Sequence, residues 1–334
     1  MSRDLAVDLG TANAVVRSPG KGVLVREPAL VAVDERTGEV LGFGEGARGV
    51  LGDDGRQAAA MWPLRRGAVT DYYVTDRLFR ALLKRAGGSR LVKPRVMVSI
   101  PSVLTPVERR ALEEAAYGAG ARSVLLISSP LAAALGGGLA IDEPHGLCVM
   151  DVGGGVTECV VLALGGLVSS RMVKMGGFDM DEAIQRMLRR DHEMAIGERA
   201  AEELKIAIGS AMPLAEDVKA EVRGRDLATG APKTAIVSAE EIRAALDEPV
   251  QAIIVALRET LAETPPELAH DVLERGITLC GGGALLEGLA QRITEETSIP
   301  VRLTEEPLDT VSLGIERAFG SLASLVRAGM VEQV

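Results

Sequence analysis

The feature that most constrains the fold is a glycine turn that occurs twice, each time at the end of a hydrophobic strand pattern. The first turn reads DLGT at 8–11 and the second reads DVGG at 151–154. Further strand patterns and then helices follow each turn, and the two turns lie about one domain length apart. The 334 residues also exceed the roughly 250–300 residues that one hydrophobic core usually holds. The sequence therefore predicts two related α/β lobes.

Both halves of the chain place strand patterns before helical patterns. In the first half we expect strands at 5–10, 13–18, 22–27, 29–35, 95–101 and 123–128, and helices at 75–86, from 105 and at 130–138. In the second half we expect strands at 146–155, 158–166, 167–177, 276–283 and 300–306, a hairpin with arms at 217–224 and 233–238, and helices at 178–192, 196–209, 284–297 and from about 309. Capping boxes mark two helix starts, Thr105 with Glu108 and Ser238 with Glu241. The helix from Ser238 is expected to be interrupted at Pro249, because proline cannot donate a helical hydrogen bond.

The composition excludes several classes of protein. A formal net charge of −10 argues against nucleic acid as a partner, which requires clustered Lys and Arg. The three cysteines, Cys148, Cys159 and Cys280, lie in apolar strand patterns without metal-ligand spacing, so we expect reduced thiols in the core. No signal peptide is recognisable, and no apolar stretch is long enough to predict a membrane-spanning helix.

Three glycine turns each follow a buried strand pattern: DLGTAN at 8–13, DVGGGVTE at 151–158 and CGGGALLEG at 280–288. One such turn is weak information, because glycine is common wherever the backbone turns tightly. Three on one chain point to phosphate binding through backbone N–H groups. Asp8 and Asp151 end their strands where a hydrated Mg²⁺ would need oxygen ligands. The third turn is expected to open a helix whose N-terminus offers donors to an anion or a sugar.

Longer motifs extend this pattern along the whole chain. They are REPALVAVDERTGEVLGFGEGAR at 26–48, VKPRVMVSIPS at 92–102, MDVGGGVTECVV at 150–161, GGFDMDEAI at 176–184, IGERAAEELKIAIG at 196–209, TPPELAHDVLERGITLCGGGALLEGL at 264–289 and EEPLDTVSLG at 305–314. In content and order these motifs resemble the MreB/Mbl family of bacterial actins, within the superfamily of actin, sugar kinases and heat-shock chaperones.

The resemblance implies an actin-like α/β fold. Each of two lobes would be built on a duplicated RNase H-like mixed sheet with flanking helices, with ATP and Mg²⁺ in the cleft between the lobes. Residues 1–142 would form the first lobe, with a C-terminal segment at about 309–334 packing back on it. Residues 143–308 would form the second lobe, including a helical and hairpin insertion at about 178–250.

The resemblance also implies site residues. The first phosphate turn would supply Asp8, Gly10, Thr11, Ala12 and Asn13, and the second Asp151, Gly153, Gly154, Gly155 and Val156. Glu202, Glu203 and Lys205 would lie near the adenosine, with Gly281, Gly282, Gly283, Ala284 and Leu285 on its other side. Asp8 and Asp151 would hold Mg²⁺ through water.

Two positions depart from the family pattern where the attacking water would be held. Val156 replaces the first threonine that usually follows the glycines, and Ser129 replaces a glutamate before Pro130. Valine and threonine have nearly the same shape, but valine lacks the hydroxyl. We therefore expect ATP to bind while its hydrolysis is slow or absent. The alternative is that Ser129 together with another acid still suffices.

The resemblance further implies paired filaments of this chain at the inner face of the cell membrane, in the cytoplasm, where they organise cell-wall synthesis proteins and cell shape. Leu91 and Val92, flanked by basic residues, would contact the membrane. The alternative is that this pair packs into its own lobe. Competing functions are a small-molecule kinase of the same superfamily and an FtsA-like division protein.

Overall fold

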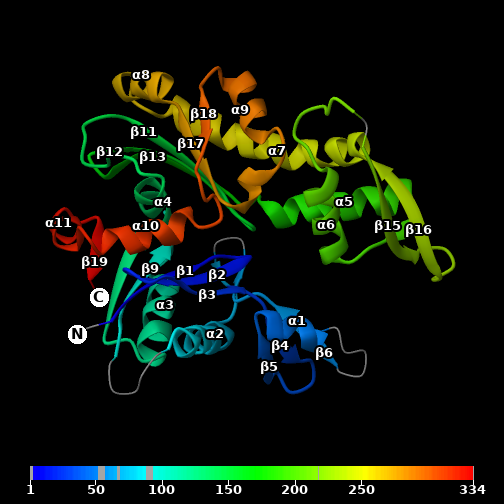
Figure 1. Ribbon diagram of the computed structural model, residues 1–334, viewed down its shortest axis with the longest axis horizontal. Coiled ribbons are helices and arrows are strands. Elements are labelled where there is room, and N and C mark those ends of the chain that lie inside the picture. Colours follow the sequence, from blue (N-terminus) through cyan, green and yellow to red (C-terminus); the bar gives the residue numbers. More distant parts are fainter. Residues whose placement is uncertain (1–2, 52–56, 66–67, 88–92, 217, 334) are drawn as a thin grey trace.

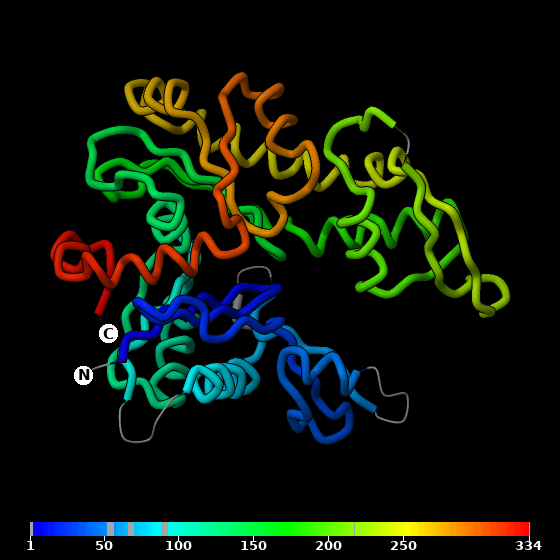
Figure 2. The backbone as a smooth tube through the Cα atoms, viewed as in Figure 1, coloured from blue at the N-terminus to red at the C-terminus, as the bar shows by residue number. Residues whose placement is uncertain are grey.

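The computed structural model describes residues 3–51, 57–65, 68–87, 93–216 and 218–333. Two mixed sheets form the centre of the molecule (Figure 1). Figure 2 shows the chain building the first sheet, then the second, and returning to the first with its last residues.

The first sheet has six strands in the order β19-β10-β9-β1-β2-β3. Its strands are β1 (Asp4–Leu9), β2 (Asn13–Ser18), β3 (Gly22–Pro28), β9 (Arg95–Ile100), β10 (Ser123–Ser128) and β19 (Val331–Gln333). Strands β1, β9 and β10 run parallel, whereas β2, β3 and β19 pair antiparallel with their neighbours.

The second sheet has five strands in the order β13-β12-β11-β17-β18. They are β11 (Leu147–Val152), β12 (Thr157–Ala163), β13 (Gly166–Val173), β17 (Ile277–Cys280) and β18 (Val301–Leu303). Strand β11 pairs antiparallel with β12 and parallel with β17, just as β1 pairs with β2 and β9. The shared order and directions confirm the predicted internal duplication.

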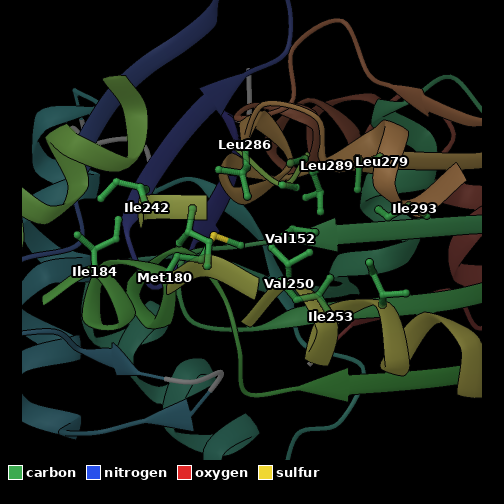
Figure 3. Packing of buried hydrophobic residues seen from close by; sticks show 14 of the residues in the cluster. Val152, Met180, Ile184, Ile242, Val250, Ile253, Leu279, Leu286, Leu289 and Ile293 are labelled. Carbon is green, nitrogen blue, oxygen red and sulfur yellow. The ribbon is translucent and has the colours of Figure 1, made fainter. Parts of the chain in front are cut away.

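Helices cover both sheets (Figure 1). They are α2 (Tyr72–Arg85), α3 (Pro106–Gly118), α4 (Ser129–Gly136), α5 (Gly177–Asp191), α7 (Ala239–Ala262), α8 (Pro266–Arg275), α9 (Leu289–Thr297), α10 (Thr310–Ala318) and α11 (Leu322–Arg327). Figure 3 shows the core of the second sheet, where Val152 lies next to Val250 of α7 and Leu279 lies next to Leu289 and Ile293 of α9. The three cysteines are free and buried, as predicted.

Two smaller units extend the sheets toward one side of the molecule (Figure 1). The first contains α1 (Glu45–Leu51), β4 (Val31–Asp34), β5 (Val40–Phe43) and β6 (Ala58–Met61), followed by the short pair β7 (Leu64–Arg65) and β8 (Ala68–Val69). The second contains α6 (Glu198–Ile208), β14 (Met194–Ala195) and the predicted hairpin of β15 (Lys219–Asp226) and β16 (Pro232–Ser238). Within the described ranges, none of the helices combines the length and apolarity needed to cross a lipid bilayer.

Both predicted capping boxes are present, at the starts of α3 and α7. The interruption at Pro249 was wrong, because α7 continues through it as one helix. Pro249 and its neighbours Leu246, Val250 and Ile253 are buried, so packing outweighs the one missing hydrogen bond.

The expected helix at 284–297 was also wrong at its start. A short 3₁₀ turn, η1 (Gly282–Leu285), follows the third glycine turn, and α9 begins only at Leu289. The chain cannot form one helix here because Gly288 adopts a left-handed conformation with φ of 73°.

Ion pairs attach α10 to the first sheet. Arg17 on β2 is 9% exposed, and its Nε donates to Glu316 Oε2 at 2.6 Å. Arg26 on β3 pairs with Asp309, which precedes α10. A buried guanidinium left without its carboxylate would be costly, so these pairs fix where α10 lies.

Helices α4 and α10 cross at very short range between the two sheets. A Cβ atom added at Gly314 would overlap the carbonyl oxygen of Ala132, and one added at Gly136 would overlap that of Thr310. Glycine is therefore required at both positions by the neighbouring backbone.

We predict that Gly314→Ala lowers the free energy of unfolding by about 1–3 kcal/mol, because the helices must separate to admit a methyl group. Urea unfolding measures the change. Gly46→Ala in α1 is the matched control, since a Cβ atom there meets no atom within 4 Å. Equal stability of the Gly314 variant and the control would contradict the prediction.

Candidate functional site

The two Asp-x-Gly turns have the same hydrogen-bonded structure. Gly10 N–H donates to Asn13 O at 3.0 Å, and Gly153 N–H donates to Val156 O at 2.9 Å. Each turn joins the first two strands of its sheet, β1 to β2 and β11 to β12. The repeated sequence therefore encodes a repeated loop.

The two turns meet across the space between the sheets. A Cβ atom on Gly154 would lie 2.8 Å from the Cβ atom of Ala12, closer than two side chains approach. None of the described residues accepts a hydrogen bond from the backbone N–H groups of Thr11, Ala12, Gly154 or Gly155. Unpaired amides from two opposed turns form a site suited to an anion such as a polyphosphate.

A cavity of about 560 Å³ opens beside these turns and is lined from both sheets. Most predicted site residues line it: Asp8, Gly10, Thr11, Ala12, Asn13, Ser129, Asp151, Gly153, Gly154, Val156, Glu202, Lys205, Gly281, Gly282, Gly283 and Leu285. The residues that the structure places away from the lining are Gly155 and Ala284, which are buried, and Glu203, which is exposed and pairs with Arg199 at 2.9 Å. The volume is within the usual range for small-molecule sites.

Buried carboxylates gather on one side of the cavity. Burial raises the pKa of Asp8 to about 6, although the Ser99 hydroxyl donates to Asp8 Oδ1 at 2.8 Å. Burial, with the charges of Glu158 and Asp8 nearby, raises the pKa of Asp151 to about 7. Among the described residues, no Lys, Arg or His pairs with Asp8, Asp151 or Glu158. The described residues contain no group of three or more Asp, Glu, His or Cys side chains placed to hold a metal ion directly, so these acids fit a hydrated Mg²⁺ held through water.

Glu158 belongs to this group, although the sequence analysis did not assign it to the site. It stands directly opposite Asp151 in the β11–β12 ladder. The Ser102 backbone N–H and hydroxyl both donate to Glu158 Oε1, at 2.8 and 2.5 Å. Ser102 follows β9 of the first sheet, so this carboxylate joins the two sheets. The sequence could have predicted this position of Glu158, because a hairpin that turns at 153–156 places residues 151 and 158 opposite each other.

Lys205 is held toward the cavity by a second buried acid that was not predicted. Its Nζ lies 2.7 Å from Asp181 Oδ1 and donates to Gly177 O at 2.9 Å. Burial raises the pKa of Asp181 to about 6 even though Lys205 opposes the change. The ion pair thus fixes a positive charge beside the second turn.

Apolar side chains also line the cavity. Ile206, Leu285 and Leu308 are 76%, 52% and 49% exposed. Exposed aliphatic side chains around a cavity favour a flat, apolar ligand group such as a nucleobase. The lining therefore combines groups suited to phosphates with groups suited to a base.

The third glycine turn also packs against the second. A Cβ atom on Gly281 or Gly283 would overlap atoms of Val152 at the end of β11. Gly281 adopts φ of 87°, which favours glycine. These glycines serve the close approach of two strands as well as the cavity lining.

Comparisons with known proteins identify the family of the chain. The family model described as "MreB/Mbl protein" matches residues 2–327. The chain is 44% identical over 319 residues to the cell shape-determining protein MreB of Escherichia coli K12, covering 94% of this chain and 92% of that one. It is 39% identical over 314 residues to the cell shape-determining protein Mbl of Bacillus subtilis, covering 94% of each chain.

Solved structures show the same fold. MreB5 of Spiroplasma citri bound to ADP superposes with a TM-score of 0.92 at 31% identity, covering 98% of this chain and 99% of that chain. A double helical filament of MamK superposes with a TM-score of 0.78 at 21% identity, covering 96% of this chain and 99% of that chain, which establishes the actin-like fold alone. The chain therefore belongs to the MreB/Mbl family of actin-like, cell-shape-determining cytoskeletal proteins.

Proposed function

We propose that this chain binds ATP with Mg²⁺ in the cavity between the two sheets and polymerises into filaments that organise cell-wall synthesis and cell shape. The observation that carries the proposal is the pair of opposed glycine turns, with unpaired amides from both sheets beside buried carboxylates. The related MreB5 has been solved with ADP and with AMPPNP, which supports a nucleotide as the ligand.

The cavity residues divide by chemistry. Amides of Thr11, Ala12 and Gly154 would bind the phosphates, because they line the cavity and lack internal acceptors. Asp8 and Asp151 would hold Mg²⁺ through water. Glu202 and Lys205 would lie near the ribose. The base would be covered by Ile206, Leu285 and Leu308. Mg²⁺ would supply positive charge between the phosphates and these acids. Its binding would remove the cost of ionising desolvated carboxylates.

Hydrolysis is proposed to be slow or absent. Ser129, the first residue of α4, and Val156, the last residue of the second turn, both line the cavity. Val156 lacks a hydroxyl, and Ser129 is shorter than the glutamate expected there and is not a base at neutral pH. Phosphate binding through the backbone does not depend on either side chain. ATP binding and ATP hydrolysis would then be separate properties in this protein.

Filaments would lie against the inner face of the cell membrane in the cytoplasm, with cell-wall synthesis proteins as partners. Residues 1–142 with about 309–334, and residues 143–308, are proposed as the two domains that close on the nucleotide. Leu91 and Val92 are proposed to contact the membrane, and they lie outside the described residues. Burying this pair is worth about 2–4 kcal/mol, which is marginal for one subunit but is multiplied along a filament.

We predict that Gly154→Val weakens Mg²⁺–ATP binding about tenfold or more and removes ATP-dependent pelleting, because the new side chain collides with Ala12. Calorimetry and sedimentation measure the two effects. Gly49→Val, where a Cβ atom meets nothing within 4 Å, is the control.

Binding should also release protons. Mg²⁺ lowers the pKa of nearby acids, and Asp8 and Asp151 have pKa values of about 6 and 7 and so hold protons at about pH 6.5. Calorimetry in buffers of different ionisation enthalpy should detect proton release at about pH 6.5 and little proton release at about pH 9.

Absence of ATP uptake at millimolar concentration would overturn the proposed function.

We predict that Ser129→Glu combined with Val156→Thr raises phosphate release by about 10²–10⁴-fold, because a base and a hydroxyl return to the cavity. Phosphate release from assembled protein is the measurement. Val107→Thr is a matched control, since Val107 is 78% exposed and distant from the cavity lining.

Turnover in the unchanged protein equal to that of the double variant would contradict impaired hydrolysis. Glu158→Gln would then identify the replacement acid, because Glu158 is a further carboxylate in the lining.

We predict that Leu91→Ser with Val92→Ser reduces flotation of filaments with vesicles containing anionic lipid. Loss of the apolar pair removes about 2–4 kcal/mol of membrane affinity per subunit, leaving about 1 kcal/mol per adjacent basic residue. Leu164→Ser with Leu167→Ser, an exposed pair on the β12–β13 turn, is the control. Unchanged flotation of the 91–92 variant would show that these residues do not contact lipid.

A further inference from the structure

One aromatic contact joins the small unit of the first sheet to the start of α5. The rings of Trp62 and Phe178 lie 5.9 Å apart between centroids, at 68° in an edge-to-face arrangement. Trp62 lies between β6 and β7, and Phe178 is the second residue of α5. The contact therefore crosses between parts of the chain that belong to different sheets.

Phe178 is fixed to the second phosphate turn. Its backbone N–H donates to Gly154 O at 2.8 Å, and Gly177 N–H donates to Gly153 O at 3.0 Å. Gly176 permits this approach, because a Cβ atom there would lie 2.6 Å from Gly153 O. Any movement of the second turn must therefore move Phe178 with it.

Trp62 is fixed on the side of the first phosphate turn. It packs against Leu30 and Ala47, and its carbonyl accepts from the Thr70 hydroxyl at 2.5 Å. Next to Leu30 in the chain, Ala29 N–H donates to Ala12 O at 2.9 Å. Trp62 is thus connected to the first turn through Leu30 and the hydrogen bond that its neighbour Ala29 makes with Ala12.

The two phosphate turns are therefore linked in two ways. Gly154 faces Ala12 directly, and the Trp62–Phe178 contact links the segments that are bonded to each turn. We propose that Trp62 and Phe178 are positioning residues that hold the two phosphate turns together and set the rate at which nucleotide leaves. The inference rests on the proposed nucleotide binding. Both rings are half-buried, so the contact can open without unfolding either core.

The same contact provides its own probe, since Trp62 is the only tryptophan of the chain. In nucleotide-free protein, Phe178→Ala should shift the emission of Trp62 to longer wavelength, because the indole becomes more exposed to water. This measurement needs no nucleotide and tests the contact by itself. An unchanged emission spectrum would overturn the inference.

The functional test is stopped-flow release of a fluorescent ATP analogue chased with excess ATP. We expect Phe178→Ala and Trp62→Ala to raise the dissociation rate about three- to tenfold each, with association rates nearly unchanged. The double variant should release nucleotide no faster than Phe178→Ala, because Trp62→Ala removes only the ring contact, whereas Phe178 also lines the cavity. Phe178→Tyr keeps an aromatic edge and should restore slow release.

Tyr73→Ala is the control, since Tyr73 is an exposed aromatic that contacts Arg77. Dissociation rates within twofold of the unchanged protein in both alanine variants would overturn the inference while leaving nucleotide binding intact. Failure of the unchanged protein to bind the analogue would instead refute the proposed function, and this inference with it.

Discussion

The approach of Gly154 to Ala12 is the constraint on which the rest of the structure depends. The turns of the two sheets can reach one ligand only if residue 154 has no side chain larger than a hydrogen atom. The crossing of α4 and α10 obeys the same requirement at Gly136 and Gly314. Close packing at both places brings Asp8 and Asp151 into one desolvated space, where burial raises the pKa of both acids and the charges of Glu158 and Asp8 add to the rise at Asp151.

Two kinds of interaction at the site respond differently to substitution. Backbone amides present the same donors whatever side chain they carry, so Val156 would leave the proposed phosphate binding intact. Orienting a water molecule needs polar side-chain atoms, which Val156 lacks. Glu158, held by Ser102, remains as a carboxylate within the cavity lining. A family member of this kind would behave as a switch governed by nucleotide exchange more than by nucleotide hydrolysis.

Local rules were sufficient for the strands of the two main sheets except β19, for both capping boxes and for the repeated turn, since each depends on residues close together in sequence. The short strands β5, β6, β7, β8, β14 and β19 were not predicted. They failed at Pro249, where burial of Leu246 and Val250 overrides a local preference, and at Gly288, whose left-handed conformation separates η1 from α9. Most of the predicted site residues line the cavity. Asp181 was missed because its role depends on Lys205, a partner brought close only by the packing of α5 on α6.

The ion pairs of α10 have a consequence for biosynthesis. Arg17 is buried in β2 near the beginning of the chain, whereas its carboxylate partner Glu316 is translated close to the end. Until that helix emerges from the ribosome, a folded first sheet would contain an uncompensated guanidinium, which is costly. The first sheet should therefore remain incomplete for nearly the whole time of translation.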